Sequence, residues 1–517
     1  MDHIDEAIGK DDKHVVSPAD RGLIQFYYTP AVRDAQAQIR ASTGALTARL
    51  LRAIDWSKGT RDAVDTATKK LSEAFSAEAA ISAISDALAT HWEELHDNVT
   101  DTDPSLRLVS RRFEDVVSHI EVMFQQGPAE IERGLDVLSD GQQSIFYFAL
   151  TAAVFDLERD AVDAKLKGFR ADELRIPALS ILGIEEPENH LSPYYLARII
   201  AHVRSIVDGN SAQGLIMSHS PAVLSRVEPT EVRYCRCESG ARESTVAPVE
   251  LLEDASDAAK FVRGAMLAYP ELYFARFVVL VEGDSERVVL PRLAQAKGLI
   301  LDPSFVAIVP LGGRHVQHFW RLLNGLSIPH ATLLDLDLGR SGGGYGRVKT
   351  IINHLLDAGW SRDQILAVKD GMLSQEQLDA MHGWDSSNTK NLRGWTNDMK
   401  NYGVYFSEPL DLDMSMLAAF PEAYKATIPE GGGPTMEPDE AAKVVLGTGG
   451  KGLDDYKNDL VKYKDRMPAY RYHFMTRSKP ATHLQALAQL DDKALSTGMP
   501  KIYRDLIKHI NDKLDRN

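Results

Sequence analysis

Three short apolar runs that end in acidic residues constrain the fold of this chain more than any other feature. They are PALSILGI (177–184), FVVLV (277–281) and the run before Asp335. Apolar runs of this length, bounded by turn residues, are typical of parallel strands that are buried on both faces. Segments with helical spacing alternate with them, so the chain is expected to be an α/β protein with parallel sheets.

A first group of chemical motifs consists of three pieces: LSDGQ (138–142), ILGIEEPENHLSP (181–193) and MSHSP (217–221). A Ser-x-Gly-Gln turn before an apolar helix offers a hydroxyl and backbone N–H groups to an anion. A strand that ends in two acids can place Glu185 beside a metal ion and Glu186 beside the attacking water. His219 follows the next strand and can reach a γ-phosphate. Each piece alone is common in solvated turns, but their order and spacing predict a nucleotide hydrolase.

In these motifs the chain resembles the ABC-type ATPases, and most closely the ATPase of the OLD (overcoming lysogenization defect) family of endonucleases. The resemblance implies that Leu138–Gln142 is the ABC signature and that Asn189–Ser192 is the D-loop. It further implies that Glu185 and Glu186 end the Walker B strand and that His219 is the switch histidine. The nucleotide-binding residues that it implies are Ser139, Gly141, Gln142, Glu185 and His219, with Glu186 catalytic.

The resemblance also requires a Walker A loop, G-x-x-x-x-G-K-[ST], whose N–H groups and lysine hold the phosphates. The nearest string is GTGGKG (447–452), in which Gly452 follows Lys451, and it comes after the other motifs rather than before them. We therefore expect the chain to begin inside the ATPase domain, past the part that grips the nucleotide, and its ATP site to be incomplete.

A second group of acidic residues lies further along the chain. VVLVEGDSERVVLPRL (278–293) places Glu282 at the end of an apolar strand, where Gly283 permits a tight turn into a helix. LLDLDLG (333–339) carries Asp335 and Asp337, and residues two apart in a strand share one face, so both carboxylates can address one metal pair. A lone D-x-D is usually a surface turn, but a preceding VEGxSE makes this the pattern of the Toprim fold of primases, topoisomerases and some nucleases.

The resemblance to the OLD family, in its class-two branch, extends through three further blocks: VPLGGRHVQHFWRLL (309–323), YFSEPLDLDMSML (405–417) and RSKPATHLQAL (477–487). It implies that Lys479 stabilises the charge of the transition state. The metal ligands that it implies are Glu282, Glu286, Asp335, Asp337, and Asp411 or Asp413. Alternate residues on one strand face could both be ligands, so the choice between Asp411 and Asp413 stays open. Arg340 and Arg347 suit DNA contacts and a solvated loop equally well.

Composition limits the class of protein. The net charge of −16 argues against a surface coated for nucleic-acid binding. A local basic groove stays possible at 451–479, where lysines and arginines interleave with tyrosines, although a solvated face explains that segment as well. Cys235 and Cys237 are the two cysteines of the sequence, which favours a reducing cytoplasm, and no apolar run is long enough to span a membrane.

The pattern along the chain gives the expected domains. Residues 1–20 form a polar N-terminal segment, and 21–235 the C-terminal part of an ABC-type ATPase domain. That part includes a buried strand at 21–32 and a helical insertion at about 42–100 that suits packing or dimerisation. Residues 236–272 form a linker, and 273–517 a Toprim nuclease domain with C-terminal helices.

Together these features predict a metal-dependent DNA endonuclease or nickase with a Toprim site that binds two Mg²⁺ or Mn²⁺ ions. The resemblance implies ATP, DNA, a homodimer, and, for members such as the Gabija nuclease subunit, defence against phage, with a helicase-like or other partner protein. The alternative is a non-catalytic, ATP-gated DNA clamp or regulatory subunit. A topoisomerase is disfavoured because no DNA-gate domain with its tyrosine is visible. A primase is disfavoured because the cysteines of its zinc-binding domain are missing.

The incomplete ATP site gives a first prediction. The purified chain alone is expected to show no appreciable ATP hydrolysis, because no Gly-rich loop with a lysine is in place to hold the phosphates. Phosphate release measured with Mg²⁺ and ATP tests this. Steady turnover by the pure protein would contradict it.

Overall fold

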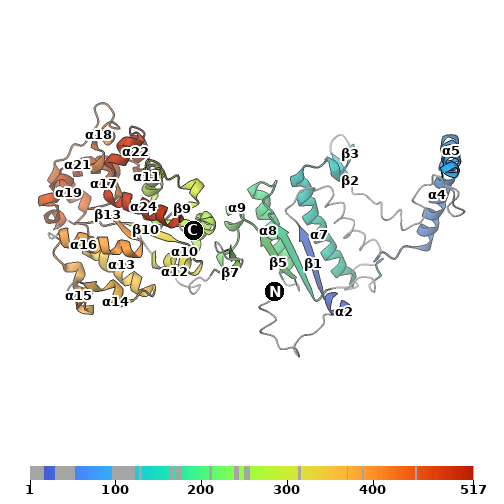
Figure 1. Ribbon diagram of the computed structural model, residues 1–517, viewed down its shortest axis with the longest axis horizontal. Coiled ribbons are helices and arrows are strands. Elements are labelled where there is room, and N and C mark those ends of the chain that lie inside the picture. Colours follow the sequence, from blue (N-terminus) through green and yellow to red (C-terminus); the bar gives the residue numbers. More distant parts are fainter. Residues whose placement is uncertain are drawn as a thin grey trace. The chain divides into compact units, whose positions relative to one another are not determined.

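The computed structural model divides the chain into two compact units, Met1–Val223 and Leu224–Asn517, each described here by itself (Figure 1). The division falls earlier in the chain than the boundary expected at residue 235. The structure describes the following residues: 17–29, 53–95, 123–126, 131–162, 168–170, 177–208, 212–237, 244–249, 257–311, 316–368, 371–386, 389–448 and 451–515.

The first unit is built on a parallel sheet in the order β1-β4-β5. Its strands are β1 (Ile24–Thr29), β4 (Leu179–Glu185) and β5 (Ala212–Met217). Two helices, α7 (Asp140–Val162) and α8 (Pro193–Val207), pack on one face of the sheet, where Leu182 and Ile184 meet apolar side chains of both helices. This arrangement confirms the expected parallel α/β fold.

The expectation that β1 is a buried strand is wrong for these residues. Phe26 is 51% exposed, and Ile24 and Tyr28 on the same face are also exposed, whereas Tyr27 on the opposite face is buried. The alternation follows from the strand period of two, because the helices cover the Tyr27 face. Gly183 lies under the ring of Phe26, where a Cβ would come within 2.6 Å of the ring.

Smaller elements complete the first unit. The helical insertion contains α4 (Lys58–Ser76), capped by the hydroxyl of Ser57, and α5 (Ala79–Leu95), while 42–52 and 96–100 lie outside the described residues. The other elements are α2 (Pro18–Arg21) and the antiparallel pair β2 (Met123–Gln126) and β3 (Ile131–Gly134), and the unit ends within α9 (Pro221–Leu224).

The second unit contains a parallel sheet in the order β13-β10-β8-β9. Its strands are β8 (Phe277–Val281), β9 (Val306–Pro310), β10 (His330–Asp335) and β13 (Val404–Ser407). All five residues of β8 are buried, as its continuous apolar run predicts for a strand with both faces covered. The parallel pairing sets the carboxyl ends of β8, β10 and β13 side by side.

Helices surround this sheet, and two short antiparallel pairs accompany it (Figure 1). The helices before β13 are α10 (Asp257–Ala268), α11 (Asp284–Gln295), α12 (Val316–Gly325), α13 (Tyr345–Asp357), α14 (Arg362–Ile365), α15 (Gln375–Ala380) and α16 (Thr389–Met399). Those after it are α17 (Leu412–Ala419), α18 (Pro421–Lys425), α19 (Pro438–Leu446), α20 (Val461–Lys464), α21 (Met467–Tyr470), α22 (Lys479–Leu487), α23 (Asp492–Gly498) and α24 (Lys501–Leu514). The pairs are β6 (Arg233–Cys237) with β7 (Ser244–Pro248), and β11 (Ala367–Val368) with β12 (Gly371–Met372).

One continuous apolar core joins these helices to both faces of the second sheet. Phe277 in β8, Phe319 in α12 and Tyr503 in α24 are fully buried members of it. Among the described residues no helix combines the length and apolar character that crossing a membrane requires.

The core predicts where the second unit is sensitive to truncation. Met399→Ala removes a fully buried side chain and should destabilise the unit by about 2–5 kcal/mol. Met372→Ala, at a position that is 56% exposed, is the matched control and should change little. Urea unfolding followed by tryptophan fluorescence measures both. Equal effects of the two changes would contradict this placement of the core.

Candidate functional site

The carboxyl edge of the second sheet gathers the acidic residues that the sequence singled out. Glu282 follows β8 directly, and Asp335 is the last residue of β10, the neighbouring strand. The backbone N–H of Asp335 donates to Glu282 Oε1 at 3.1 Å, so the two strand ends are joined through a carboxylate. Ligand sites of open parallel sheets lie at this edge.

Glu286 reaches the same place from the first turn of α11. Gly283 precedes this helix, and its N–H donates to Glu286 Oε2 at 3.0 Å. A glutamate at the third helical position that binds back to the capping residue is a known way to satisfy a free N–H at a helix start. Here it also fixes a buried carboxylate beside Glu282.

The pKa values of all three carboxylates are raised. Burial raises the pKa of Asp335 well above its usual value, and the charges of Glu282 and Asp411 raise it further. Burial raises the pKa of Glu286 to about 8, and the charge of Asp413 adds to this. Burial also raises the pKa of Glu282, against the lowering effect of Arg347. Buried acids that repel one another in this way favour a cation between them.

Asp337 lies beyond the strand, which corrects one geometric prediction. β10 ends at Asp335, and Asp337 has a left-handed backbone with φ of 52°, so the two do not share a strand face as D-x-D in a strand would. Arg340 donates to Asp337 Oδ1 at 2.7 Å, and Nε of Arg347 donates to Oδ2 at 3.1 Å. Arg347 also lies 3.5 Å from Glu282 Oε1. The negative charge of Asp337 is thus balanced by two arginines, Arg340 in the loop after β10 and Arg347 at the start of α13.

The turn at Gly343 keeps this loop compact. A Cβ at Gly343 would lie 1.8 Å from the carbonyl oxygen of Asp337, so the close approach of the two backbones requires glycine. This explains part of the SGGGYG string, and it means that Arg340 lies in a packed turn rather than in an open solvated loop, while Arg347 lies in the first turn of α13.

Asp411 and Asp413 belong to a helix start, which corrects a second prediction. β13 ends at Ser407, and Asp411 caps α17 by accepting from the N–H of Met414 at 2.9 Å. The two aspartates are therefore not alternate residues of one strand. Asp411 accepts from the hydroxyl of Tyr470 at 2.5 Å, and the N–H of Leu412 donates to Asp335 at 3.2 Å.

Asp413 is paired with two nitrogen groups. Lys479 Nζ lies 2.6 Å from Asp413 Oδ2, and His483 Nε2 lies 2.8 Å from Oδ1. Burial alone would raise the pKa of Asp413, but the hydrogen bond of His483 and the charge of Lys479 hold it below its usual value. Asp413 and Asp411 likewise raise the pKa of Lys479, against the effect of burial. Lys479 is therefore a cation at this site.

The fit of a metal ion follows from this arrangement. Within the described part of the chain, no group of three or more His, Cys, Asp or Glu side chains stands ready to hold a metal ion. Asp337 is turned toward the two arginines and Asp413 toward Lys479. Glu286, which is buried, and Glu282 and Asp335, which are partly buried, remain as hard-oxygen donors with raised pKa values, and donors of this kind suit Mg²⁺ or Mn²⁺.

The basic and aromatic segment 451–479 does not present a row of stacking rings. Tyr456 and Tyr470 are about 1% exposed, and their hydroxyls bind Leu338 O and Asp411. These tyrosines are core residues that support the loop after β10 and the turn before α17. Lys464 pairs with Asp439 at 2.6 Å, which also favours a structural reading of the segment.

The ATPase motifs of the first unit also converge. Glu185 ends β4, and the next residue, Glu186, has a positive φ of 41°. His219 Nε2 lies 2.7 Å from Glu186 Oε1, and the amide of Asn189 donates to Glu186 Oε2 at 2.6 Å. The expected acid and the expected switch histidine are therefore in direct contact.

The signature segment lies against the expected D-loop. A Cβ at Gly141 would come within 2.6 Å of the backbone oxygen of His190, so the contact needs glycine. Ser139 and Gln142 bind one another, since the N–H and the hydroxyl of Ser139 both donate to Gln142 Oε1 at 3.1 Å. Figure 1 shows α7, which begins here, alongside the strands of the first sheet.

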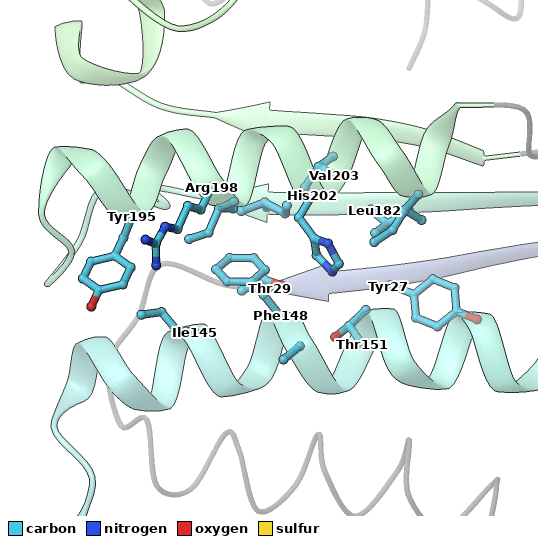
Figure 2. Close-up of a pocket in the computed structure, with 14 residues that line it drawn as sticks. Tyr27, Thr29, Ile145, Phe148, Thr151, Leu182, Tyr195, Arg198, His202 and Val203 are labelled. Carbon is cyan, nitrogen blue, oxygen red and sulfur yellow. The ribbon is translucent and has the colours of Figure 1, made fainter.

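A pocket of about 190 Å³ lies between α7, α8 and the sheet (Figure 2). Figure 2 shows Phe148 of α7 and Tyr195, Arg198 and His202 of α8 around it, with Tyr27 among the sheet residues. Neither Glu186 nor His219 lines it, and none of the described lining residues is acidic. The pocket is therefore separate from the converging ATPase motifs.

Sequence reasoning missed three residues of the second site. Tyr470 and His483 contact Asp411 and Asp413 directly, and Tyr424 binds His483 at 2.6 Å. The one available signal for His483 was its position four residues after Lys479, which puts both on one face of a helix.

The raised pKa of Glu286 gives a pH-dependent prediction for the metal-free protein. Between its ordinary pKa of about 4.5 and its folded pKa of about 8, the unfolded chain releases the proton that the folded chain keeps. The free energy of unfolding therefore falls as pH rises through this range. Glu286→Gln has no carboxyl proton to lose, so the contribution of Glu286 to this fall disappears in the variant. Urea midpoints with EDTA should show the gain of the variant over wild type growing from pH 5 to pH 8.

The exposed Glu422 provides the control for this experiment. Glu422→Gln should leave the pH dependence as it is in the wild type. If Glu286→Gln also leaves it unchanged, Glu286 does not keep a proton in the folded protein.

Comparison with known proteins finds a family profile for part of each unit. Residues 273–337 match the family profile described as "Overcoming lysogenization defect protein-like, TOPRIM domain", and residues 45–225 match "AAA domain, putative AbiEii toxin, Type IV TA system". No curated protein matches the chain.

Solved structures that resemble the chain include two C-terminal regions of OLD proteins. That from Xanthomonas campestris pv. campestris is 21% identical over 48% of this chain and 97% of its own, with a TM-score of 0.28. That from Burkholderia pseudomallei is 19% identical over 47% of this chain and 99% of its own, also with a TM-score of 0.28. From its two family profiles, the chain combines an AAA-type ATPase domain with a Toprim domain of the OLD-like family.

Proposed function

We propose that this protein is a metal-dependent DNA endonuclease or nickase whose Toprim site is controlled by the ATPase domain. The observation that carries the proposal is the cluster of Glu286, which is buried, with Glu282 and Asp335, which are partly buried, and with Lys479 on the neighbouring helix α22. Hydrolysis of a phosphodiester is assisted by carboxylates that hold a divalent cation and by a charged lysine that offsets negative charge on the phosphate.

Each residue has a defined part in this proposal. Glu282, Glu286 and Asp335 would hold Mg²⁺ or Mn²⁺, which supplies an activated water and neutralises the leaving oxygen when bound. Lys479, whose side chain is 45% exposed, can reach a phosphate and offset its developing negative charge. The N–H groups that bind Glu282 and Asp335 keep both carboxylates oriented before substrate arrives.

The two arginines provide the contact to DNA in this proposal. Arg340 and Arg347 are about 28% and 29% exposed, and both hold Asp337. Arg340 already meets Asp337 and Asp411, and Arg347 meets Asp337 and Glu282, so a DNA phosphate would be bound by the exposed part of each guanidinium. Such a local cluster permits DNA binding by a chain of net charge −16.

The ATPase domain supports a regulatory role. Glu186 and His219 are in contact, so a γ-phosphate that engages His219 would alter the partner of Glu186. We propose that ATP and a second copy of the chain act here, and that the protein serves in defence against phage with a further partner protein. We also propose a reducing cytoplasmic location, with which a chain whose two cysteines are Cys235 and Cys237 is in keeping.

Cleavage of supercoiled plasmid with Mn²⁺ or Mg²⁺ and without ATP tests the nuclease. Asp335→Ala combined with Asp337→Ala should abolish cutting, because the variant loses a metal donor and the anchor of both arginines. Asp335→Asn keeps the side-chain shape and should also lose nearly all activity.

Asp302→Asn, at an exposed aspartate away from the sheet edge, is the control and should cut at the wild-type rate. Continued cutting by the double variant would exclude this site. A wild-type chain that binds DNA without cutting it would instead favour the non-catalytic clamp.

A further inference from the structure

We propose that Tyr424, His483 and Asp413 form a buried relay that positions Lys479 at the acidic site, and that Asp413 is the anchor of Lys479 rather than a metal ligand. This inference rests on the proposed function, because Lys479 is taken there as the residue that offsets charge on the cleaved phosphate. His483 and Tyr424 are then positioning residues, which act through Asp413.

The contacts form a single chain from the core to the surface. Tyr424 Oη lies 2.6 Å from His483 Nδ1, and His483 Nε2 lies 2.8 Å from Asp413 Oδ1. Asp413 Oδ2 lies 2.6 Å from Lys479 Nζ. The first three side chains are buried, whereas that of Lys479 is 45% exposed. The chain therefore ends at the one member that can meet a substrate.

The direction of the hydrogen bonds follows from the donors and acceptors. A neutral imidazole carries one hydrogen, and the hydroxyl of Tyr424 can donate to Nδ1 of His483. The hydrogen is then on Nε2, which donates to Asp413 Oδ1. This leaves Asp413 Oδ2 to accept from Lys479, so Tyr424 selects the tautomer that holds the carboxylate in place.

The helices make this arrangement rigid. Lys479 and His483 lie four residues apart on α22 and so share one face. Asp413 comes from the first turn of α17 and Tyr424 from α18. The ring of Phe474 stacks on His483 with centroids 5.0 Å apart, which fixes the plane of the imidazole. The position of Lys479 thus depends on three elements that pack together.

The same contacts separate Asp413 from the metal-binding set. Both of its oxygens are engaged, and one faces an ammonium group that repels a metal ion. Asp335 is the contrast, because the charges around it that affect it most are those of other carboxylates. Metal ions are therefore expected at Asp335 and its acidic neighbours and not at Asp413.

Two readouts that do not need DNA cleavage test the relay in the full chain. The first is the rate at which acetic anhydride acetylates Lys479, followed by mass spectrometry. The second is binding of Mn²⁺, followed by the electron paramagnetic resonance signal of the free ion. Plasmid cleavage with Mn²⁺ is the third readout, and it reports kcat and KM separately.

His483→Ala should expose Lys479, so that its acetylation becomes severalfold faster while Mn²⁺ affinity stays unchanged. Cleavage should lose about tenfold to a hundredfold in kcat, the usual effect of removing a group that orients a site residue. His483→Gln should restore both values most of the way, because its amide can donate to Asp413 and accept from Tyr424. Asp413→Asn should also free Lys479 without a change in Mn²⁺ affinity.

His473 supplies the matched control. It is buried like His483 and its ring lies 5.9 Å from that of Tyr424, but its Nδ1 has no hydrogen-bond partner. His473→Ala should therefore lower stability without speeding the acetylation of Lys479. Equal acetylation rates in His483→Ala and wild type would overturn the relay, and so would a loss of Mn²⁺ affinity in Asp413→Asn.

The readouts also separate this inference from the proposed function. If the wild-type chain cuts no DNA, the nuclease proposal fails, while the acetylation and Mn²⁺ results still decide whether the relay holds Lys479. If the wild type cuts and the relay variants behave like wild type in all three readouts, the nuclease stands and the relay fails.

Discussion

The second unit depends on how it keeps several carboxylates buried at one edge of a parallel sheet. Asp335 ends β10, one of the two inner strands, and burial together with neighbouring negative charge raises its pKa. Charged acids at such a place cost free energy unless cations or hydrogen bonds offset the cost. The surrounding elements supply both: N–H groups bind Glu282 and Asp335, and basic side chains bind Asp337 and Asp413.

This compensation divides the acidic residues into two groups. Asp337 is in close contact with two arginines and Asp413 with Lys479 and His483, whereas Glu282 has Arg347 at 3.5 Å, and Glu286 and Asp335 bind backbone N–H groups. The first group holds the basic side chains at the site, and the second is the set that we propose binds a divalent cation. In this proposal, metal binding and the positioning of lysine and arginine fall to different carboxylates of one cluster.

The first unit also gathers polar side chains at the carboxyl edge of its own parallel sheet. Glu185 ends β4, and the turn after it brings Glu186 against His219, which follows the adjacent strand β5. Gly141 lets the start of α7 approach the turn at His190. In both units, a strand end followed by a tight turn gathers polar groups from segments that are distant in sequence.

The sequence by itself determined the class of fold and identified most of the acidic residues of the candidate site. Both follow from a local pattern, an apolar strand that ends in a carboxylate. It gave the parallel strands β4, β8 and β10, and it singled out Glu282 and Asp335 for the place where the structure puts them. Tertiary structure alone decided which partner each carboxylate has. Asp337 lies in a turn and Asp411 at a helix start, although the spacing of two residues had predicted that each aspartate pair shares one face of a strand. His483 meets Asp413 because α22 packs on neighbouring helices. Such pairings depend on contacts between residues far apart in the chain, which no local pattern records.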